Sequence, residues 1–370
     1  MRIGIMTFHR ACNPGAVLQA YALQTCLAGL GHDAFFLDYV FPRIKARGIR
    51  NWIGRTPYRT LTKLQTLWVN HIYRSYRQRH LKIEPPAYFD YHDLELRPPA
   101  VDTLICGSDQ VWNPLIVKNE KDQRAYLLDF GSQNVKRIAY AVSLGTDKLP
   151  EDCAVRLKES FEAFCAVGVR EIGAVELLAR LGIQGVTWVP DPTMLLEAGD
   201  YRDLEEAVGV PDEEYVFWYQ LQGSPEKTSF CRMVVQMCAR ILGGSSFRAN
   251  CTIPLMSTKH WRVHNPGQWL RALRKSSCVV TDSFHGVIFS ILFGKPFVVI
   301  ERWGESSDMN IRIQTLEQVF GFKERILTGR EDEPTISDIC RKVLRERTEY
   351  AEKLDQLRAI GKSFLSKALE

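Results

Sequence analysis

The stretch from Cys278 to Ile300 constrains the fold of this chain more than any other. It opens with a short uncharged run, Cys278–Val280, of the kind found in parallel strands that are covered on both faces. Asp282 and Ser283 are helix N-cap residue types, and they stand directly before the apolar run Val287–Phe293. A glycine and a proline end that run, and a second short apolar segment follows. The pattern predicts a buried strand, a tight turn, a buried helix and a second buried strand.

The turn of this unit brings Ser283, His285 and Gly286 to a helix N-terminus at the carboxyl end of a strand. Open α/β sheets bind ligands at that edge, and the free N–H groups and dipole of the helix favour an anion. From the residues alone, two interpretations stay open: an anion site, or an ordinary turn that carries a solvated histidine.

The rest of the chain repeats the same strand–turn–helix pattern. Its 370 residues, 45% of them hydrophobic and 25% charged, are enough for two α/β domains. A predicted strand at Arg2–Phe8, an amphipathic helix at Ala16–Leu30 and a strand at Ala34–Tyr39 form a parallel opening unit. Further strands are predicted at Val101–Cys106, Ile138–Leu144, Ala166–Arg170, Val186–Val189 and Tyr215–Tyr219.

An acidic, glycine-containing segment at Glu197–Glu214 marks the predicted domain boundary. We therefore expect a Rossmann-like domain at 1–208 and a second at 209–370, each with a parallel sheet. Leucines recur at helical spacing from Ile336 to Leu369 and predict a long C-terminal helix that packs across both domains.

Polar residues also follow other strands. Asn13 and Gly15 lie in the turn after the first strand, without the glycine pattern of a dinucleotide or P-loop site. The octapeptide Gly107–Pro114 follows another strand and offers carbohydrate-binding chemistry, polar groups for hydroxyls and an indole for a sugar face. Its candidate residues are Ser108, Asp109, Gln110, Trp112 and Asn113. The alternative is a polar loop that one buried tryptophan anchors.

Arg170 stands at the exit of a predicted strand, on the same sheet edge as these turns. Spacing leaves two roles open for it: a ligand contact, or a salt bridge with Glu171 or Glu176.

The window from Phe41 to Lys82 contains eleven Lys and Arg residues and no Asp or Glu, with aromatic residues interleaved. It predicts a helical excursion over 41–84 that either meets an anionic membrane surface or packs as a solvated helix. No nucleic-acid recognition motif occurs, so nucleic acid is not an expected partner. The ten cysteines form no C-x-x-C pair, and no metal site is expected. We expect a cytoplasmic protein, peripheral at the inner membrane face.

Taken in order, these motifs resemble the polysaccharide pyruvyl transferase family. The matching segments are Gly4–Phe8, Asn13–Gln24, Ile105–Pro114, Gly168–Glu171, Asp191–Pro192, Thr281–Gly286 and Gly294–Pro296. The resemblance implies a two-domain fold like that of GT-B glycosyltransferases, phosphoenolpyruvate as donor, no cofactor, and a sugar hydroxyl pair as acceptor. It also implies that Arg170 and His285 bind or activate the donor. The basic window and the C-terminal helix lie outside it.

The chemistry of pyruvyl transfer fits these side chains. A carboxylate and a phosphate on the donor need cations and N–H groups, which Arg170, Arg312 and the helix N-terminus at Ser283–Gly286 offer. His285 can act as general acid or as general base, and both roles stay open. Two alternatives remain: a nucleotide-sugar glycosyltransferase on the same architecture, and a non-catalytic glycan-binding subunit.

Overall fold

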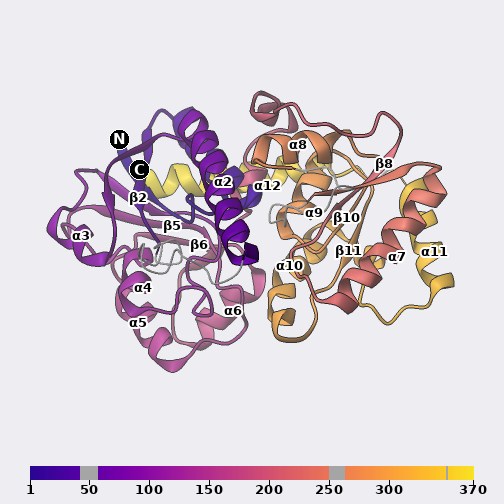
Figure 1. Ribbon diagram of the computed structural model, residues 1–370. Helices are drawn as coiled ribbons and strands as arrows, with labels where there is room; N and C mark the ends of the chain where they lie inside the picture. The colour runs from indigo at the N-terminus through magenta and orange to yellow at the C-terminus, as the bar shows by residue number, and fades with distance from the viewer. Residues whose placement is uncertain (42–56, 250–262, 347–348) are drawn as a thin grey trace.

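The computed structural model describes residues 1–41, 57–249, 263–346 and 349–370. These residues form two parallel sheets, one in each of two lobes that lie side by side (Figure 1). The predicted fold class is therefore confirmed: two Rossmann-like domains in a GT-B-like arrangement.

The first sheet has the strand order β3-β2-β1-β4-β5-β6-β7. Its strands are β1 (Arg2–Met6), β2 (Asp33–Tyr39), β3 (Ile83–Tyr88), β4 (Thr103–Cys106), β5 (Lys136–Val142), β6 (Ala166–Val169) and β7 (Val186–Trp188). The helices of this part are α1 (Pro14–Gly29), α2 (Pro57–His80), α3 (Tyr91–Leu96), α4 (Glu120–Tyr126), α5 (Glu151–Phe161) and α6 (Ile172–Arg180), and the short 3₁₀ helices η3 (Pro192–Met194) and η4 (Ala198–Leu204) follow.

The second sheet has the order β12-β11-β10-β8-β9. Its strands are β8 (Tyr215–Tyr219), β9 (Ser245–Ala249), β10 (Cys278–Thr281), β11 (Phe297–Ile300) and β12 (Ile326–Leu327). The helices are α7 (Pro225–Leu242), α8 (Pro266–Lys275), α9 (Phe284–Leu292), η5 (Gly304–Asn310), α10 (Ile311–Phe320), η6 (Lys323–Arg325) and α11 (Glu333–Arg345).

The predicted strand–helix–strand unit is β10, α9 and β11, and the two strands pair in parallel. All nine residues of α9 are buried, so apolar burial rather than amphipathic patterning holds this helix. The Ser283 hydroxyl caps it by accepting a hydrogen bond from the Gly286 N–H, and Gly294 follows its end with φ +60°.

Helix α1 begins at Pro14, two residues before the predicted Ala16, because the Asn13 side chain accepts from the Ala16 N–H and Pro14 takes the first helical position. The prediction of an amphipathic helix is wrong, however, since twelve of its sixteen residues are buried. One side of α1 packs on its own sheet, and Leu18 and Ala22 on the other side join an apolar cluster with Trp269 of the second domain. The two domains therefore share a continuous core.

The C-terminal region forms two helices rather than one. α11 lies on α7, and α12 (Ala351–Leu369) runs from the second lobe back along the first (Figure 1). Leu357 packs into the shared cluster, whereas Leu365 and Leu369 pack with Ile5 of the first sheet. The end of α12 therefore packs on the first domain although it follows the second in sequence.

Candidate functional site

The carboxyl ends of the two sheets meet at the domain boundary, and the polar motifs of the sequence come together there. Ser108 follows β4, Arg170 follows β6 and Asp191 follows β7 in the first domain. Across the boundary, His285 lies in the first turn of α9 and Arg312 in the first turn of α10.

Arg170 is held by a network of its own domain. Its Nη1 lies 3.0 Å from Asp191 Oδ2 and 3.2 Å from Ser108 Oγ, and its Nε lies 3.4 Å from Glu171 Oε1. Burial by itself would lower the pKa of Arg170, but Glu171 and Asp191 raise it above the usual value. The guanidinium also lies 4.4 Å from the ring centroid of Phe284 in the second domain. Arg170 is thus a neutralised cation that ties the two domains together.

His285 crosses the boundary in the opposite direction. Its Nε2 lies 3.6 Å from Asp191 Oδ2, which is longer than a hydrogen bond but within reach of an ion pair. Its ring lies directly on Gly15, where a Cβ atom would come within 2.1 Å of Nδ1. The absence of a side chain at Gly15 is what lets the histidine approach the first domain.

Asp191 joins these two residues, a role that the sequence analysis missed although the residue lies in a quoted motif. Burial would raise the pKa of this carboxyl, but His285 and Arg170 outweigh burial and hold it well below its usual range. Thr193 adds two hydrogen bonds, from its N–H at 3.0 Å and its hydroxyl at 2.6 Å. The carboxylate is therefore fixed in place and ionised.

Arg312 differs from Arg170 because the charges of Glu171 and Asp109 only partly offset the burial of its own charge. It is buried, its Nε has no hydrogen-bond partner, and it forms no ion pair within the described part of the chain. Burial lowers the pKa of Arg312 to about 9, and Arg302 and Arg170 add to the effect. Arg302, which the sequence analysis did not single out, is half-buried and likewise has no carboxylate partner among the described residues. A buried positive charge that is only partly compensated is typical of an anion site.

The N-terminus of α9 offers fewer donors than its sequence indicates. The predicted contact through Gly286 is not available, because the Gly286 N–H already donates to Ser283 Oγ at 3.2 Å. Ser283 serves mainly as this cap, and Gly286 permits close packing on Thr281. Within the described residues, no hydrogen bond engages the N–H groups of Phe284 and His285, so these two remain for an anion.

A buried ion pair lies next to the turn between β10 and α9. Lys227 Nζ lies 2.8 Å from Asp282 Oδ2, and both side chains are fully buried. Asp282 also accepts hydrogen bonds from the N–H groups of Leu221 and Gln222. Asp282 therefore fastens the loop after β8 to the turn that carries His285, in addition to its predicted place beside the helix cap.

The predicted sugar-binding loop divides into structural and accessible parts. Trp112 is buried against Phe164 and donates to the Tyr126 carbonyl, so the structure does not support its predicted role as a stacking face. Gln110 and Asn113 are also buried and hydrogen-bond each other, and their predicted contact with an acceptor stays a prediction. Sequence could not separate these cases, because burial of the loop depends on distant helices.

Asp109 is the member of this loop that stays partly exposed. Its φ of +84° is uncommon for a residue with a side chain. Its carboxylate is close enough to Arg170 and Arg312 to favour the charged form of both guanidinium groups. For Arg312 burial outweighs this effect, and the pKa is lowered overall. Asp109 therefore faces the cation cluster from the first domain.

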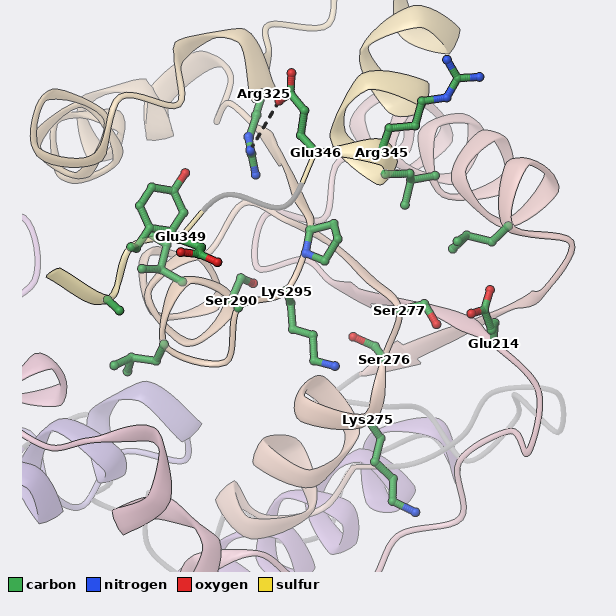
Figure 2. A pocket seen from close by; sticks show the side chains of 18 of the residues that line it. Glu214, Lys275, Ser276, Ser277, Ser290, Lys295, Arg325, Arg345, Glu346 and Glu349 are labelled. Atoms are coloured by element: carbon green, nitrogen blue, oxygen red, sulfur yellow. Dashed lines mark ion pairs between the residues drawn. The ribbon is translucent and has the colours of Figure 1, made fainter. Parts of the chain in front are cut away.

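Two further features lie apart from this arrangement. No three His, Cys, Asp or Glu side chains of the described residues come together as metal ligands would. A hollow of about 750 Å³ lies at the opposite edge of the second sheet, where Ser276, Ser277, Lys295 and Arg325 precede its strands (Figure 2). Arg325 pairs there with Glu346 at 3.7 Å.

Comparison with known proteins identifies the family. A family model described as polysaccharide pyruvyl transferase matches residues 13–304, most of the chain. The chain belongs to the polysaccharide pyruvyl transferase family. This pyruvyl transferase family member is therefore a transferase, and the family implies a polysaccharide acceptor. The match includes Arg170, Asp191 and His285, while Arg312 lies just beyond it.

This pyruvyl transferase also matches solved structures in its fold, at low sequence identity. The UDP-GlcNAc 2-epimerase of Methanocaldococcus jannaschii matches with a TM-score of 0.53 and 9% identity, over 100% of this chain and 99% of that one. The UDP-GlcNAc 2-epimerase of Neisseria meningitidis matches with a TM-score of 0.50 and 10% identity, over 100% and 98%. No curated protein matches the chain in sequence. At such identities the likeness is one of architecture.

Proposed function

We propose that the site transfers a pyruvyl group from phosphoenolpyruvate to a hydroxyl pair of a sugar, in a cell-surface polysaccharide or its lipid-linked precursor. Family membership supports the reaction class. The observation that carries the choice of donor is the buried guanidinium of Arg312, which forms no ion pair with a described residue and whose pKa the nearby Arg302 and Arg170 lower further. A small dianion or trianion would neutralise that charge.

The donor binds through its two anionic groups. Arg312, Arg302 and the free N–H groups at the start of α9 receive its phosphate and carboxylate. Arg170 contributes its buried, unpartnered Nη2 atom, while its other nitrogens hold the first domain in position. Planar guanidinium groups suit a carboxylate better than lysines would.

The reaction then needs proton transfers at defined atoms. A proton added to the methylene carbon makes the neighbouring carbon electrophilic, and a first sugar hydroxyl attacks that carbon. Phosphate leaves, a second hydroxyl closes the ketal, and the two hydroxyl protons pass to phosphate and to a base. His285 is the group that moves a proton, and the ionised Asp191, whose Oδ2 lies 3.6 Å from Nε2, orients its ring. Asp109 faces the acceptor and hydrogen-bonds to one of its hydroxyls.

Donor binding tests this proposal by calorimetry. We expect wild-type protein to bind phosphoenolpyruvate, Arg312→Gln to bind it about tenfold more weakly or worse, and the surface control Arg341→Gln to bind it normally. His285→Ala should still bind the donor but turn over about a hundredfold more slowly. A melting-temperature rise with UDP and none with phosphoenolpyruvate would overturn the proposal and favour a nucleotide-sugar transferase.

We also propose peripheral contact with an anionic membrane at the cytoplasmic face, through α2. None of the described helices is both long and apolar enough to cross a bilayer. Along the described side chains of α2, Leu67 and Trp68 are 47% and 48% exposed, and Arg74 is exposed beside them. Arg77 is buried, and Arg79 is exposed but pairs with Glu206 at 2.6 Å, so neither arginine, which the sequence placed in the same basic surface, offers a free charge to a membrane. The first part of the predicted excursion, 42–56, lies outside the described residues.

A further inference from the structure

A second buried arginine of the first domain, Arg77, has no carboxylate partner among the residues that the structure describes. Only 8% of the residue is exposed, and its Nη1 has no hydrogen-bond partner. It forms no ion pair within the described residues. The sequence from Phe41 to Lys82 contains no Asp or Glu, so the segment before α2 offers no carboxylate either.

The neighbours of Arg77 come from the loop after β1. Burial is the largest effect that lowers the pKa of Arg77, and the guanidinium of Arg10 lowers it further, while the Cys12 thiol opposes both. Arg10 binds Asp38 through two hydrogen bonds, at 2.6 and 2.9 Å. The carboxylate of Asp38 thus neutralises Arg10 alone, and the charge of Arg77 leaves the cluster positive.

His9 adds a second unsatisfied nitrogen to the same cluster. The residue is fully buried and stacks on Phe36. Its Nδ1 lies 3.1 Å from the Thr7 carbonyl, whereas its Nε2 is 3.7 Å from Asp38 and has no hydrogen-bond partner. Two buried nitrogens without partners in one place are uncommon in folded proteins, and a bound anion would accept a hydrogen bond from the Arg77 N–H group.

The cluster lies on the same sheet edge as the donor site. His9 contacts Thr7, the Thr7 hydroxyl donates to the Ser108 carbonyl at 2.5 Å, and the Ser108 hydroxyl reaches Arg170. The end of β1, which His9 follows, and the end of β6, which Arg170 follows, are three strand spacings apart, or ~14 Å. That span is close to the length of one hexose that carries a diphosphate.

We propose that Arg10 and Arg77, with His9, form a subsite for a phosphate or diphosphate group at the reducing end of the acceptor sugar. The assignment to an acceptor rests on the proposed function, because the pyruvyl group must reach the hydroxyls at the far end of the same sugar. A phosphate at this subsite would orient the sugar so that its hydroxyl pair faces His285. The subsite would also select carrier-linked precursors over finished polysaccharide.

Binding of inorganic pyrophosphate tests the subsite without the donor. Arg312→Gln serves as background, so that the donor site does not retain the probe. In this background we expect Arg77→Gln and Arg10→Gln each to weaken pyrophosphate binding about tenfold or more. Arg74→Gln, on the exposed face of the same helix, is the matched control and should bind normally. An unchanged dissociation constant in Arg10→Gln and Arg77→Gln would overturn the proposal.

A fallback variant and a competition experiment complete this test. If Arg77→Gln does not fold, Arg77→Lys, which retains the charge, and Arg10→Gln carry the test. Competition by UDP or by farnesyl diphosphate then identifies the carrier: displacement by the first supports a nucleotide-linked acceptor, and displacement by the second supports a lipid-linked one. Failure of both to displace pyrophosphate would also overturn the subsite. Failure of phosphoenolpyruvate to bind the wild-type protein would refute the proposed function, and the pyrophosphate result would still stand.

Discussion

A methyl group at Gly15 would collide with the imidazole of His285. The Cβ atom of an alanine there would lie 2.1 Å from Nδ1, 2.4 Å from Cγ and 2.9 Å from Cβ of the histidine. Non-bonded carbon atoms normally approach to about 3.5–4.0 Å, so the ring would have to retreat by roughly 1.5 Å. Because the domains share an apolar core, they cannot simply separate to relieve the contact.

Gly15→Ala should therefore reduce turnover without unfolding the protein. A misplacement of about 1 Å costs up to about a hundredfold in rate, and we expect a loss of this size in kcat. Alanine is a better helix former than glycine by up to ~1 kcal/mol, so α1 itself should not be weakened. The expected pattern is a melting temperature close to that of the wild type together with a large loss of activity.

The assay is phosphate release from phosphoenolpyruvate with acceptor glycan, measured beside thermal unfolding. Gly29→Ala is the matched control, because Gly29 lies in the same helix and nothing comes within 4 Å of its added methyl. Wild-type turnover in Gly15→Ala would show that His285 need not touch the first domain, and the proposed catalytic arrangement would fall.

Three further outcomes are expected. Arg312→Gln should raise the free energy of unfolding at pH 7 by about 1–3 kcal/mol, because the buried charge has no partner. The folded pKa of Arg312, about 9, lies below the unfolded value, so this gain in stability should shrink as pH rises above about 9. Denaturant titrations at pH 7 and 10 measure the gain, and a larger gain at pH 10 would contradict the prediction. Asp191→Asn should lose about 3–5 kcal/mol of unfolding free energy near neutral pH. The wild-type carboxylate contributes fully above the pKa of an unfolded aspartate, ~4, so the difference should shrink as pH falls from there toward the lower folded pKa. Equal stability of the two proteins at pH 7 would remove Asp191 from the ion-pair network. Replacing Leu67, Trp68 and Arg74 together should weaken sedimentation with anionic vesicles at low salt. Arg79→Gln, at an arginine that pairs with Glu206, is the control and should sediment normally. Unchanged sedimentation of the triple variant would refute the membrane contact.

The elements that sequence predicted best are those with local signals. Strand β8 has its predicted bounds, and α9 has its predicted cap and glycine stop. Cap hydrogen bonds and short β-branched runs act within a few residues, so the sequence around each element is enough to predict it. The family motifs likewise indicated the reaction class that the family model now supports.

The environment of each charge was decided by tertiary structure. Arg74 and Arg77 lie three residues apart in the same basic window, yet one is exposed and the other buried. Arg170 is neutralised by Asp191, 21 residues away, whereas Arg312 has no such partner. Local sequence cannot carry this information, because burial and charge balance depend on which distant segments the fold brings into contact.

By itself, the sequence determined two parallel α/β units, their caps, and the edge of each sheet that carries polar residues. Only the tertiary structure decided that Trp112 supports the core, that α12 returns to the first domain, and that His285 rests on Gly15. The physical reason is the distance in sequence between the interacting residues. Hydrogen bonds and apolar patterns within an element depend on residues that are neighbours in the chain. Contacts across the domain boundary are set by how two completed surfaces fit together.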